Sequence, residues 1–339
     1  MSDVRRYLHQ FLMDPCVIDV PYLVRKFIVC ASILPTRPKH TAAAYQSIWW
    51  DEGSPLVVIS QRVRDALQSR VEMPIELGMR YGSPSVASAL RRLFDRGGEP
   101  LQEVLVIPLY PHYAQSTVRT AVDEVETAHR RADRSVRITV LPPFYDDPLY
   151  IDALAASMQE PMHWEHDHLL FSYHGIPEKH LRKEDHTGTH CLASSDCCDR
   201  DSPALEHCYR AHCMRATRAV AAHMDLAPER YSISFQSRLG RDPWIQPFTD
   251  HEVVRLAGAG TRRLLIVCPS FVSDCLETLE EIGIRARKDF IAAGGEDLRL
   301  IPCMNDHPSW IAALKSWCET GRRPVRDPTR AGPASRRRM

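Results

Sequence analysis

His174 has a residue type and a position in the sequence that could support chemistry. It directly follows the apolar run 168–173 and precedes Gly175. Ligands bind at the carboxyl ends of parallel strands, and a histidine there can accept a proton near neutral pH or bind a metal. The chain has sixteen histidines, however, and a single one is more often a capping or loop residue. His174 alone therefore has two interpretations: a functional base or ligand, or an ordinary loop histidine.

A row of carboxylates follows a second apolar run, 263–268. Asp274, Glu277 and Glu281 are spaced three and four residues apart, so on a helix they share one face. Ser273 or Asp274 is a natural N-cap for that helix. Such a row can pass on protons or guide a cation, but acidic residues near a helix start also complement the helix dipole. Both interpretations stay open for Glu277.

The two features gain force in combination. If the strands ending at Tyr173 and Cys268 belong to one parallel sheet, both open on its carboxyl side. His174 and Glu277 would then face each other across one cleft. A histidine with a carboxylate suits the delivery of a divalent metal and the removal of protons.

Five of the eleven cysteines lie within 182–213, a segment rich in polar residues. The chain opens without a signal peptide, so we expect a reducing compartment, where clustered cysteines bind metal rather than form disulfides. Four thiolates suit a [2Fe–2S] cluster or Zn²⁺, and free thiols are the third possibility. The spacing does not say which four of the five would be ligands. They are Cys191, Cys197, Cys198, Cys208 and Cys213.

Short β-branched runs alternate with longer stretches of helical apolar spacing. This alternation predicts an α/β fold with parallel sheets flanked by helices. The pattern runs twice, over 1–155 and 156–325, so we expect two domains. The tail 326–339, rich in Arg and Pro, is expected to be disordered. The expected strands are 75–79, 103–109, 136–141, 168–173, 231–236 and 263–268, and the expected helices include 85–96, 117–131, 147–158, 208–223 and 274–293.

Composition and motifs disfavour several classes of protein. The 43 basic and 43 acidic residues give a formal net charge of zero, without the basic excess of a nucleic-acid-binding protein. No apolar run approaches the ~20 residues that a spanning helix needs, so a cytoplasmic protein is the default. The sequence contains neither the Gly-x-Gly-x-x-Gly dinucleotide motif after a strand nor a phosphate-binding loop ending in Gly-Lys-Ser/Thr. A nucleotide enzyme is therefore disfavoured despite the α/β layout.

Five stretches resemble signature motifs of the ferrochelatase family. They occur in collinear order, and the resemblance covers about residues 3–320. Several motifs in one order are far more specific than any one of them. They are Gly78–Pro84 (GMRYGSP), Pro108–Tyr113 (PLYPHY), Ser172–Pro177 (SYHGIP), Phe235–Trp244 (FQSRLGRDPW) and Ser273–Leu279 (SDCLETL).

The resemblance implies two similar Rossmann-like domains with a porphyrin cleft between them. By position in the motifs, His174 would accept the pyrrole protons or bind the metal. Glu277 would be its carboxylate partner, and Glu281 would continue the acidic row as a metal ligand. The residues implied to bind the porphyrin are Arg80, Tyr81, Tyr110 and Trp244.

The implied reaction is the insertion of Fe²⁺ into protoporphyrin IX, which gives protoheme and releases two protons in heme biosynthesis. The enzyme would be a lyase-class metal chelatase, active as a monomer or a homodimer. Its partners would be porphyrin and ferrous iron, and the residues do not separate protoporphyrin from coproporphyrin. The stretch Phe27–Pro35, with Tyr22 and Leu23 before it, corresponds to an apolar lip over the cleft. It would suit a flat substrate or peripheral contact with the inner membrane face, and the alternative is an ordinary buried helix.

The Cys-rich segment resembles the internal insertion of a bacterial subgroup of the family, and some ferrochelatases carry a [2Fe–2S] cluster. The animal arrangement does not apply, because Gln115 stands at its first-domain Cys position and the C-terminus offers only Cys303 and Cys318. Cys275 likewise replaces a histidine of animal enzymes. Family members usually open with an apolar strand, whereas Val4–Leu8 matches the helix that follows it. We therefore expect the first domain to lack its opening strand.

Three other functions are compatible with parts of this pattern. A cobalt or nickel tetrapyrrole chelatase would use the same base and carboxylates. A non-enzymatic Fe–S redox-sensing protein would use the insertion as its functional site, and His174 would then be dispensable. A two-lobed small-molecule-binding protein would need an export signal, which the sequence does not show.

Overall fold

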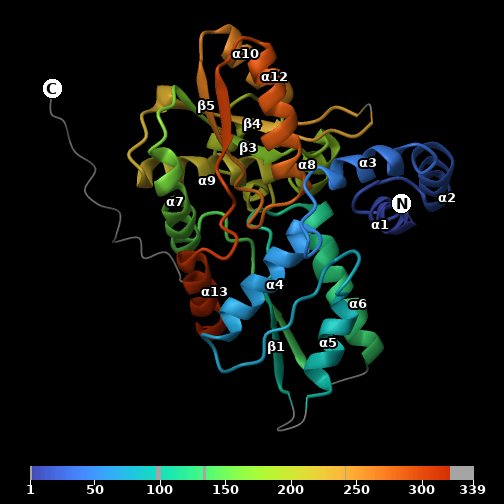
Figure 1. The fold of residues 1–339 in the computed structure, drawn as a ribbon. Coiled ribbons are helices and arrows are strands. Elements are labelled where there is room, and N and C mark those ends of the chain that lie inside the picture. Colours follow the sequence, from blue (N-terminus) through green and yellow to red (C-terminus); the bar gives the residue numbers. More distant parts are fainter. Residues whose placement is uncertain (1, 97–100, 133–134, 241, 321–339) are drawn as a thin grey trace.

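The computed structural model describes residues 2–96, 101–132, 135–240 and 242–320 (Figure 1). The expected disordered tail 326–339 lies outside the described residues. Strands and helices alternate along the chain, and the pairings between the named strands are parallel. The predicted α/β class with parallel sheets flanked by helices is confirmed.

A four-stranded sheet organises the second half of the chain, at the top of Figure 1. Its strands in spatial order are β4 (Tyr231–Gln236), β3 (His168–His174), β5 (Arg263–Val267) and β6 (Asp297–Leu300). Phe171 of β3 faces one apolar cluster and Leu170 faces the other, so helices cover both sides of the sheet. This double burial explains the continuous apolar runs of β3 and β5. The covering helices are α7 (Pro148–Met162), α9 (Tyr209–His223) and α13 (Pro308–Thr320) on one side, and α10 (Thr249–Gly258) and α12 (Arg287–Ala292) on the other.

A smaller sheet lies in the first half of the chain, at the bottom of Figure 1. Its two strands, β1 (Glu103–Val106) and β2 (Arg137–Val140), pair in parallel along their full length. Helices α5 (Val86–Phe94) and α6 (Thr120–Ala132) pack with this sheet in a small apolar core. The expected strand 75–79 was wrong, because Met79 makes only an isolated bridge, to Ser85.

One large apolar core joins the two halves. Helix α4 (Pro55–Gln68) contributes Ile59 and Val63 to the same cluster as Trp310 and Trp317 of α13. Figure 1 shows α4 and α13 side by side between the two sheets, and α13 also packs on α7. The predicted division at 155–156 falls inside α7. The division into two domains stays a prediction.

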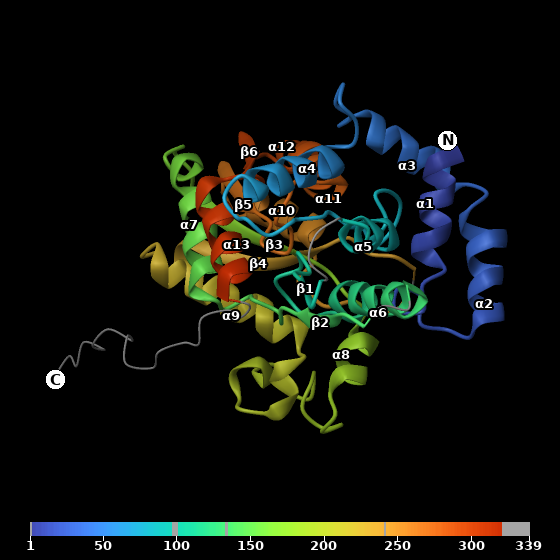
Figure 2. The same cartoon turned by 90° about the horizontal axis from the view of Figure 1, so that it is seen from below.

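The first helices form a flank on the right of Figures 1 and 2. They are α1 (Ser2–Leu12), α2 (Tyr22–Phe27), the π-helical turn η1 (Ile28–Ile33) and α3 (Arg37–Gln46). Leu8 and Leu12 of α1 pack against Val29 and Leu34 in a separate small cluster. The flank therefore has its own apolar contacts beside the main core.

The outer side of α2 is apolar and exposed. Leu23 is 76% exposed, Phe27 71% and Tyr22 57%. The alternative of an ordinary buried helix therefore fails for Tyr22, Leu23 and Phe27, whereas Val29 and Leu34 of the same stretch are buried. None of the helices within the described ranges is long and apolar enough to cross a membrane.

Two elements of the second half differ from expectation. Strand β6 was not predicted, because its sequence Asp-Leu-Arg-Leu alternates polar and apolar residues at the edge of the sheet. The expected helix 274–293 is divided into α11 (Leu276–Leu279), the π-helical turn η6 (Glu281–Ala286) and α12. The remaining short elements are η2 (Gln115–Arg119), α8 (Glu178–Glu184), η3 (Cys197–Asp199), η4 (Pro203–Glu206) and η5 (Pro228–Arg230).

Candidate active site

His174 is the last residue of β3, at the carboxyl edge of the sheet. Its Nδ1 lies 2.6 Å from the backbone oxygen of Gly175. Since a carbonyl oxygen only accepts hydrogen bonds, Nδ1 carries the hydrogen, and the lone pair is on Nε2. A neutral imidazole in this tautomer can accept a proton at Nε2, and the Gly175 carbonyl then stabilises the cation.

Gly175 allows the chain to pass very close to its neighbours. A Cβ at this position would lie 3.0 Å from the Gln236 oxygen, 3.1 Å from the Ser237 oxygen and 3.3 Å from Trp244 Cε3. The Gly175 amide donates to the same Gln236 oxygen at 2.6 Å. The glycine predicted to give room beside His174 is therefore needed for this packing, and Trp244 lies against its backbone.

The end of β4 connects the histidine to the acidic helix. Gln236 pairs with His174 in the sheet register, and its Nε2 donates to the backbone oxygen of Glu277 at 2.7 Å. Ser237 donates to both carboxylate oxygens of Glu281, from its amide at 2.9 Å and its hydroxyl at 2.6 Å. The structure thus brings His174, Glu277 and Glu281 near one another at the end of β4. That His174 and Glu277 face each other across a cleft stays a prediction. Gln236 and Ser237 were known only as part of a motif, and their positioning role was missed.

Electrostatics also connect these three side chains. Burial raises the pKa of Glu281, and the charge of Glu277 also raises it. The Ser237 hydrogen bonds and the charges of Arg285 and His174 lower the pKa. The net pKa lies above the ordinary value because burial outweighs the favourable contacts. A carboxyl group of this kind exchanges a proton closer to neutral pH than an exposed glutamate does.

Asp274 does not belong to the acidic face. The N-cap of α11 is Cys275, in a capping box with Thr278, so the predicted cap at Ser273 or Asp274 was wrong. The Asp274 carboxylate is buried and accepts from the Thr278 hydroxyl at 2.9 Å and from Asn305 Nδ2 at 2.7 Å. These contacts fix the loop before the helix and turn this carboxylate away from the row.

Two tyrosines of the N-terminal flank interact with Glu277. Burial and the Glu277 charge raise the pKa of Tyr45 in α3. In α1, burial, Tyr45 and then Glu277 raise the pKa of Tyr7. Helices α1 and α3 thus bring aromatic hydroxyls to the acidic side of the site. No local pattern predicts this, because Tyr7 and Tyr45 lie more than 200 positions from Glu277.

Arg80 and Tyr81 are held in a polar network of the first half. Arg80 Nη2 contacts Asp14 Oδ2 at 2.5 Å and its Nε donates to the Thr120 hydroxyl at 2.8 Å, while the Tyr81 hydroxyl donates to the same Asp14 oxygen at 2.9 Å. Burial raises the pKa of Asp14, but these hydrogen bonds and the Arg80 charge outweigh it, so the pKa is lowered. Tyr110 is partly buried nearby: burial raises its pKa and the Arg80 charge lowers it.

Comparison with known proteins identifies the family. The ferrochelatase family model matches residues 1–321. A ferrochelatase from Ectopseudomonas mendocina (strain ymp) is 52% identical over 321 residues, which are 94% of this chain and 93% of the relative. One from Azotobacter vinelandii (strain DJ / ATCC BAA-1303) is 51% identical over 323 residues, 94% of each chain. The chain belongs to the ferrochelatase family.

A solved structure supports the fold of this ferrochelatase family member. The structure of SirB from Bacillus subtilis with Fe³⁺ matches 79% of this chain and 91% of the SirB chain. The TM-score is 0.51 and the sequence identity is 13%. Ferrochelatases insert ferrous iron into a porphyrin, so the chain is a lyase-class metal chelatase of heme biosynthesis. The relatives favour neither a cobalt or nickel chelatase nor a redox-sensing protein.

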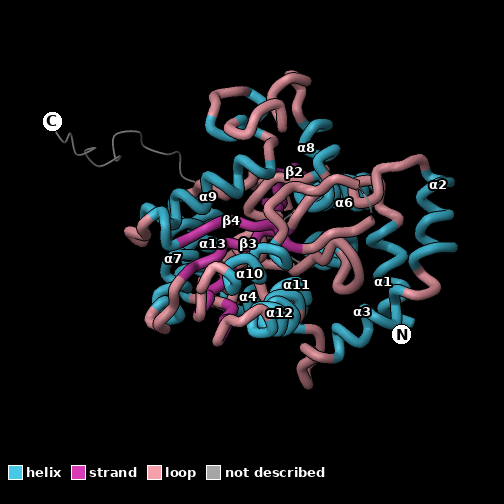
Figure 3. Tube along the Cα trace, turned by 90° about the horizontal axis from the view of Figure 1, so that it is seen from above, coloured by secondary structure: helices cyan, strands magenta, loops and turns pink. Residues whose placement is uncertain are grey.

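The Cys-rich insertion of this ferrochelatase is a folded loop between α8 and α9, at the top of Figure 3. Asp185 organises its start by accepting from the backbone amides of Thr187, His190 and Cys191 at 2.7 to 3.0 Å. Burial raises the pKa of Asp185, but these hydrogen bonds outweigh it, and the net pKa is lowered. The chain thus orders this loop through its own polar contacts.

All five cysteines of the insertion are buried, and four of them are connected. The Sγ atoms of Cys197 and Cys198 are 4.0 Å apart. Burial raises the pKa of Cys191 although a hydrogen bond with the Cys208 thiol lowers it. For Cys198, the hydrogen bond with Cys208 and then burial both raise the pKa. Cys213 belongs to the same apolar core, but its hydrogen-bonding neighbour is Tyr209. Across the described ranges, no group of three or more His, Cys, Asp or Glu side chains could hold a metal ion.

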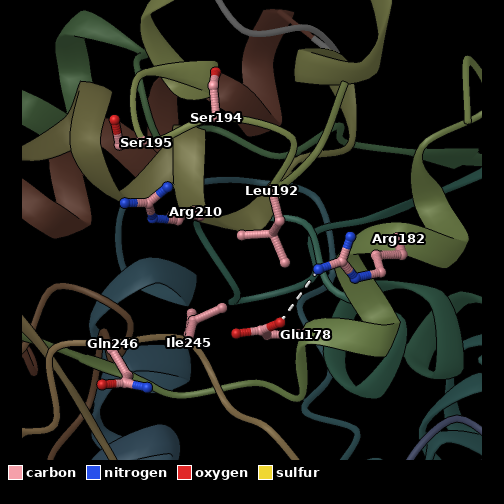
Figure 4. Close-up of a pocket in the computed structure, with 8 residues that line it drawn as sticks. All are labelled: Glu178, Arg182, Leu192, Ser194, Ser195, Arg210, Ile245 and Gln246. Carbon is pink, nitrogen blue, oxygen red and sulfur yellow. Dashed lines mark hydrogen bonds and ion pairs between the residues drawn. The ribbon is translucent and has the colours of Figure 1, made fainter. Parts of the chain in front are cut away.

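A pocket of about 370 Å³ opens beside the insertion (Figure 4). Arg210 borders it, with Nη1 3.9 Å from the Cys198 sulfur and 4.0 Å from the Cys197 sulfur. On the opposite side, Arg182 pairs with Glu178 at 3.4 Å. The pocket therefore connects solvent to a cation that touches two of the cysteines. The other lining residues are Leu192, Ser194, Ser195, Ile245 and Gln246.

Proposed function

We propose that Nε2 of His174 accepts the pyrrole protons as Fe²⁺ enters protoporphyrin IX to give protoheme. The observation that carries this proposal is the 2.6 Å contact between Nδ1 and the Gly175 oxygen, which leaves the lone pair on Nε2. The reaction is balanced: Fe²⁺ replaces two N–H protons, so the porphyrin product is neutral and two protons leave. His174 is a catalytic residue in this scheme and a potential ligand of the incoming metal.

Glu277 and Glu281 are proposed to guide Fe²⁺ and take protons onward from His174. The raised pKa of Glu281 supports a proton-accepting role, because a carboxyl group with a raised pKa binds a proton more readily than an exposed glutamate does. Carboxylate oxygen and imidazole nitrogen together suit a divalent first-row metal. Ser237 would keep Glu281 oriented while its charge changes.

The porphyrin is proposed to lie against Arg80, Tyr81, Tyr110 and Trp244. Arg80 is already engaged by Asp14 and Thr120, which supports a role in shaping the wall of the cleft. Aromatic rings suit the flat macrocycle because they bury large apolar area.

A [2Fe–2S] cluster is proposed to be held by Cys191, Cys197, Cys198 and Cys208. Such a cluster takes four thiolates, two at each iron, and the insertion offers these four buried thiols. The thiol contacts among these four support this set, and the hydrogen bond of Cys213 with Tyr209 argues against the fifth. When bound, the cluster would supply one-electron redox chemistry and tie the ends of the loop together.

We also propose that the enzyme works in the cytoplasm and contacts the inner membrane face through α2. The exposed Leu23 and Phe27 would enter the lipid boundary, and Lys26 beside them would favour anionic headgroups. This arrangement suits an apolar substrate that partitions into membranes.

An anaerobic assay tests the proposed base and substrate. Wild type, His174→Ala and His168→Ala would be given Fe²⁺ with protoporphyrin IX or with coproporphyrin. We expect wild type and His168→Ala to insert iron into protoporphyrin IX, and His174→Ala to be about a hundredfold slower or worse, because a lost general base costs that much. His168 is the matched control, since it lies at the other end of β3 and bonds Ser232. Equal rates for wild type and His174→Ala would reject His174 as the base, and a preference for coproporphyrin would reject the proposed substrate.

A further inference from the structure

The backbone of His174 is held by two hydroxyl groups on one side. The Tyr209 hydroxyl lies 2.8 Å from the His174 oxygen and 2.9 Å from Ser270 Oγ, and the His174 amide lies 3.2 Å from the same Oγ. Each hydroxyl can donate once. The His174 amide therefore donates to the Ser270 hydroxyl, the Ser270 hydroxyl donates to Tyr209, and the Tyr209 hydroxyl donates to the His174 carbonyl. These three hydrogen bonds form a closed ring, which we call the hydroxyl ring.

The hydroxyl ring lies beside the end of β3 that β5 does not pair with. On one side, β3 pairs with β4 as far as His174 and Gln236. On the other side, its pairing with β5 stops at Phe171 and Val267. The peptide groups of His174 would otherwise lack partners on that side, and buried backbone groups require them. Tyr209 and Ser270 supply those partners and fix where the histidine leaves the sheet.

The same helix start also contacts the insertion. Cys208 is the N-cap of α9, Tyr209 is its first residue, and the side chain of Arg210 reaches the sulfurs of Cys197 and Cys198. Figure 2 shows the insertion loops lying beside α9 and α8. Three consecutive residues thus join the Cys-rich loop to the backbone of the histidine.

We infer that Tyr209 is a positioning residue for His174 and that, through it, the order of the Cys-rich insertion controls the rate of metal insertion. This inference rests on the proposed role of His174 as the base. A displaced loop would move Cys208 and Arg210, tilt the start of α9 and open the hydroxyl ring. The imidazole would then lose its orientation while the porphyrin walls stay in place, so the effect falls on kcat and not on KM.

Tyr209→Phe tests the positioning role directly. The variant keeps the buried ring beside His112 and removes only the hydroxyl. We expect kcat to fall about tenfold with the porphyrin KM within about twofold, since a tenfold change is about 1.4 kcal/mol, within the range that one hydrogen bond contributes. Ser270→Ala should behave alike, and the double variant should be no slower than either single one because the ring opens once. Additive losses, or an unchanged kcat in Tyr209→Phe, would overturn the inference.

Tyr173→Phe is the matched control for a general packing effect. Its hydroxyl bonds Thr217 on α9 at 2.7 Å, so the substitution removes another buried contact between β3 and the same helix. We expect its kcat to stay within about twofold of wild type. A loss equal to that of Tyr209→Phe would mean that α9 packing in general, and not the hydroxyl ring, is responsible.

Backbone hydrogen exchange separates this inference from the proposed function. Opening the hydroxyl ring in Tyr209→Phe should speed hydrogen exchange of the His174 amide at least about tenfold. Because the inference has the insertion act through Tyr209, Cys208→Ala should speed the same exchange. Unchanged exchange in both variants would reject the inference even if His174 is the base. Faster exchange in both, combined with normal iron insertion by His174→Ala, would instead reject the proposed function. In kinetic assays, Cys208→Ala should lower kcat when it is introduced into the wild-type enzyme. Introduced into Tyr209→Phe, it should cause no further loss of kcat.

Discussion

At the scale of single residues, the chemistry depends on which nitrogen of His174 is free. The Gly175 carbonyl takes the hydrogen of Nδ1, and the close approach of Gln236 and Ser237 to Gly175 holds that carbonyl in place. A side chain at position 175 would separate these segments. The proposed base is thus oriented by a backbone contact that the close packing around Gly175 holds in place.

Ser237→Ala tests the positioning of Glu281. The variant removes the 2.6 Å hydroxyl contact and keeps the backbone amide contact at 2.9 Å. We expect the KM for Fe²⁺ to rise about tenfold, since a hydrogen bond to a charged group contributes about 1.5 kcal/mol or more. Ser232→Ala, at the opposite end of β4, is the control and should leave this KM unchanged. If both variants keep the wild-type KM, Glu281 does not guide the metal.

The convergence of the candidate side chains was predictable from the sequence, but the residues that hold them in position were not. His174, Glu277 and Glu281 follow apolar runs, so their convergence at one sheet edge follows from parallel topology. The contacts of Gln236 and Ser237 depend on the register between β3 and β4, which no local pattern encodes. Asp274 was misassigned to the acidic face because Asn305, its partner, lies 31 positions away.

At the scale of elements, five of the six described strands were readable from the sequence, and the edge strand β6 was not. β3 and β5 are covered on both faces and give continuous apolar runs. β6 lies at an edge and alternates, so it was missed. The π-helical turn η6 divides the expected helix 274–293, although its apolar spacing is regular. Tertiary contacts, such as that between Ser237 and Glu281, decide this geometry.

The insertion is an element whose ligands can be tested one by one. We expect Cys→Ser at 191, 197, 198 or 208 to remove iron and acid-labile sulfide from the purified protein, because each change removes one of four thiolates. Cys213→Ser and Cys318→Ser should keep both, since Cys213 interacts with Tyr209 and Cys318 lies in α13. The measurement is iron and sulfide per chain after anaerobic purification. A wild-type protein without sulfide, or loss in Cys213→Ser but not in Cys208→Ser, would contradict the proposed ligand set.

At the scale of the whole molecule, the two halves act together. The core shared by α4, α7 and α13 fixes one half against the other. Across that arrangement, Tyr7 and Tyr45 of the N-terminal flank come close enough to Glu277 for its charge to raise their pKa. A flat substrate could therefore contact the flank and the catalytic sheet at the same time. The sequence motifs implied a cleft, but only the assembled chain shows which helices border the acidic side.

The most direct test of the central claim follows protons and porphyrin together. Protein loaded with protoporphyrin IX would be mixed anaerobically with Fe²⁺, and porphyrin fluorescence and a pH indicator would be recorded in a stopped-flow instrument. Wild type should lose fluorescence and release two protons per porphyrin in the same phase. His174→Ala should bind the porphyrin with an affinity within about threefold of wild type but insert iron about a hundredfold more slowly. Wild-type insertion and proton release by this variant would contradict the account.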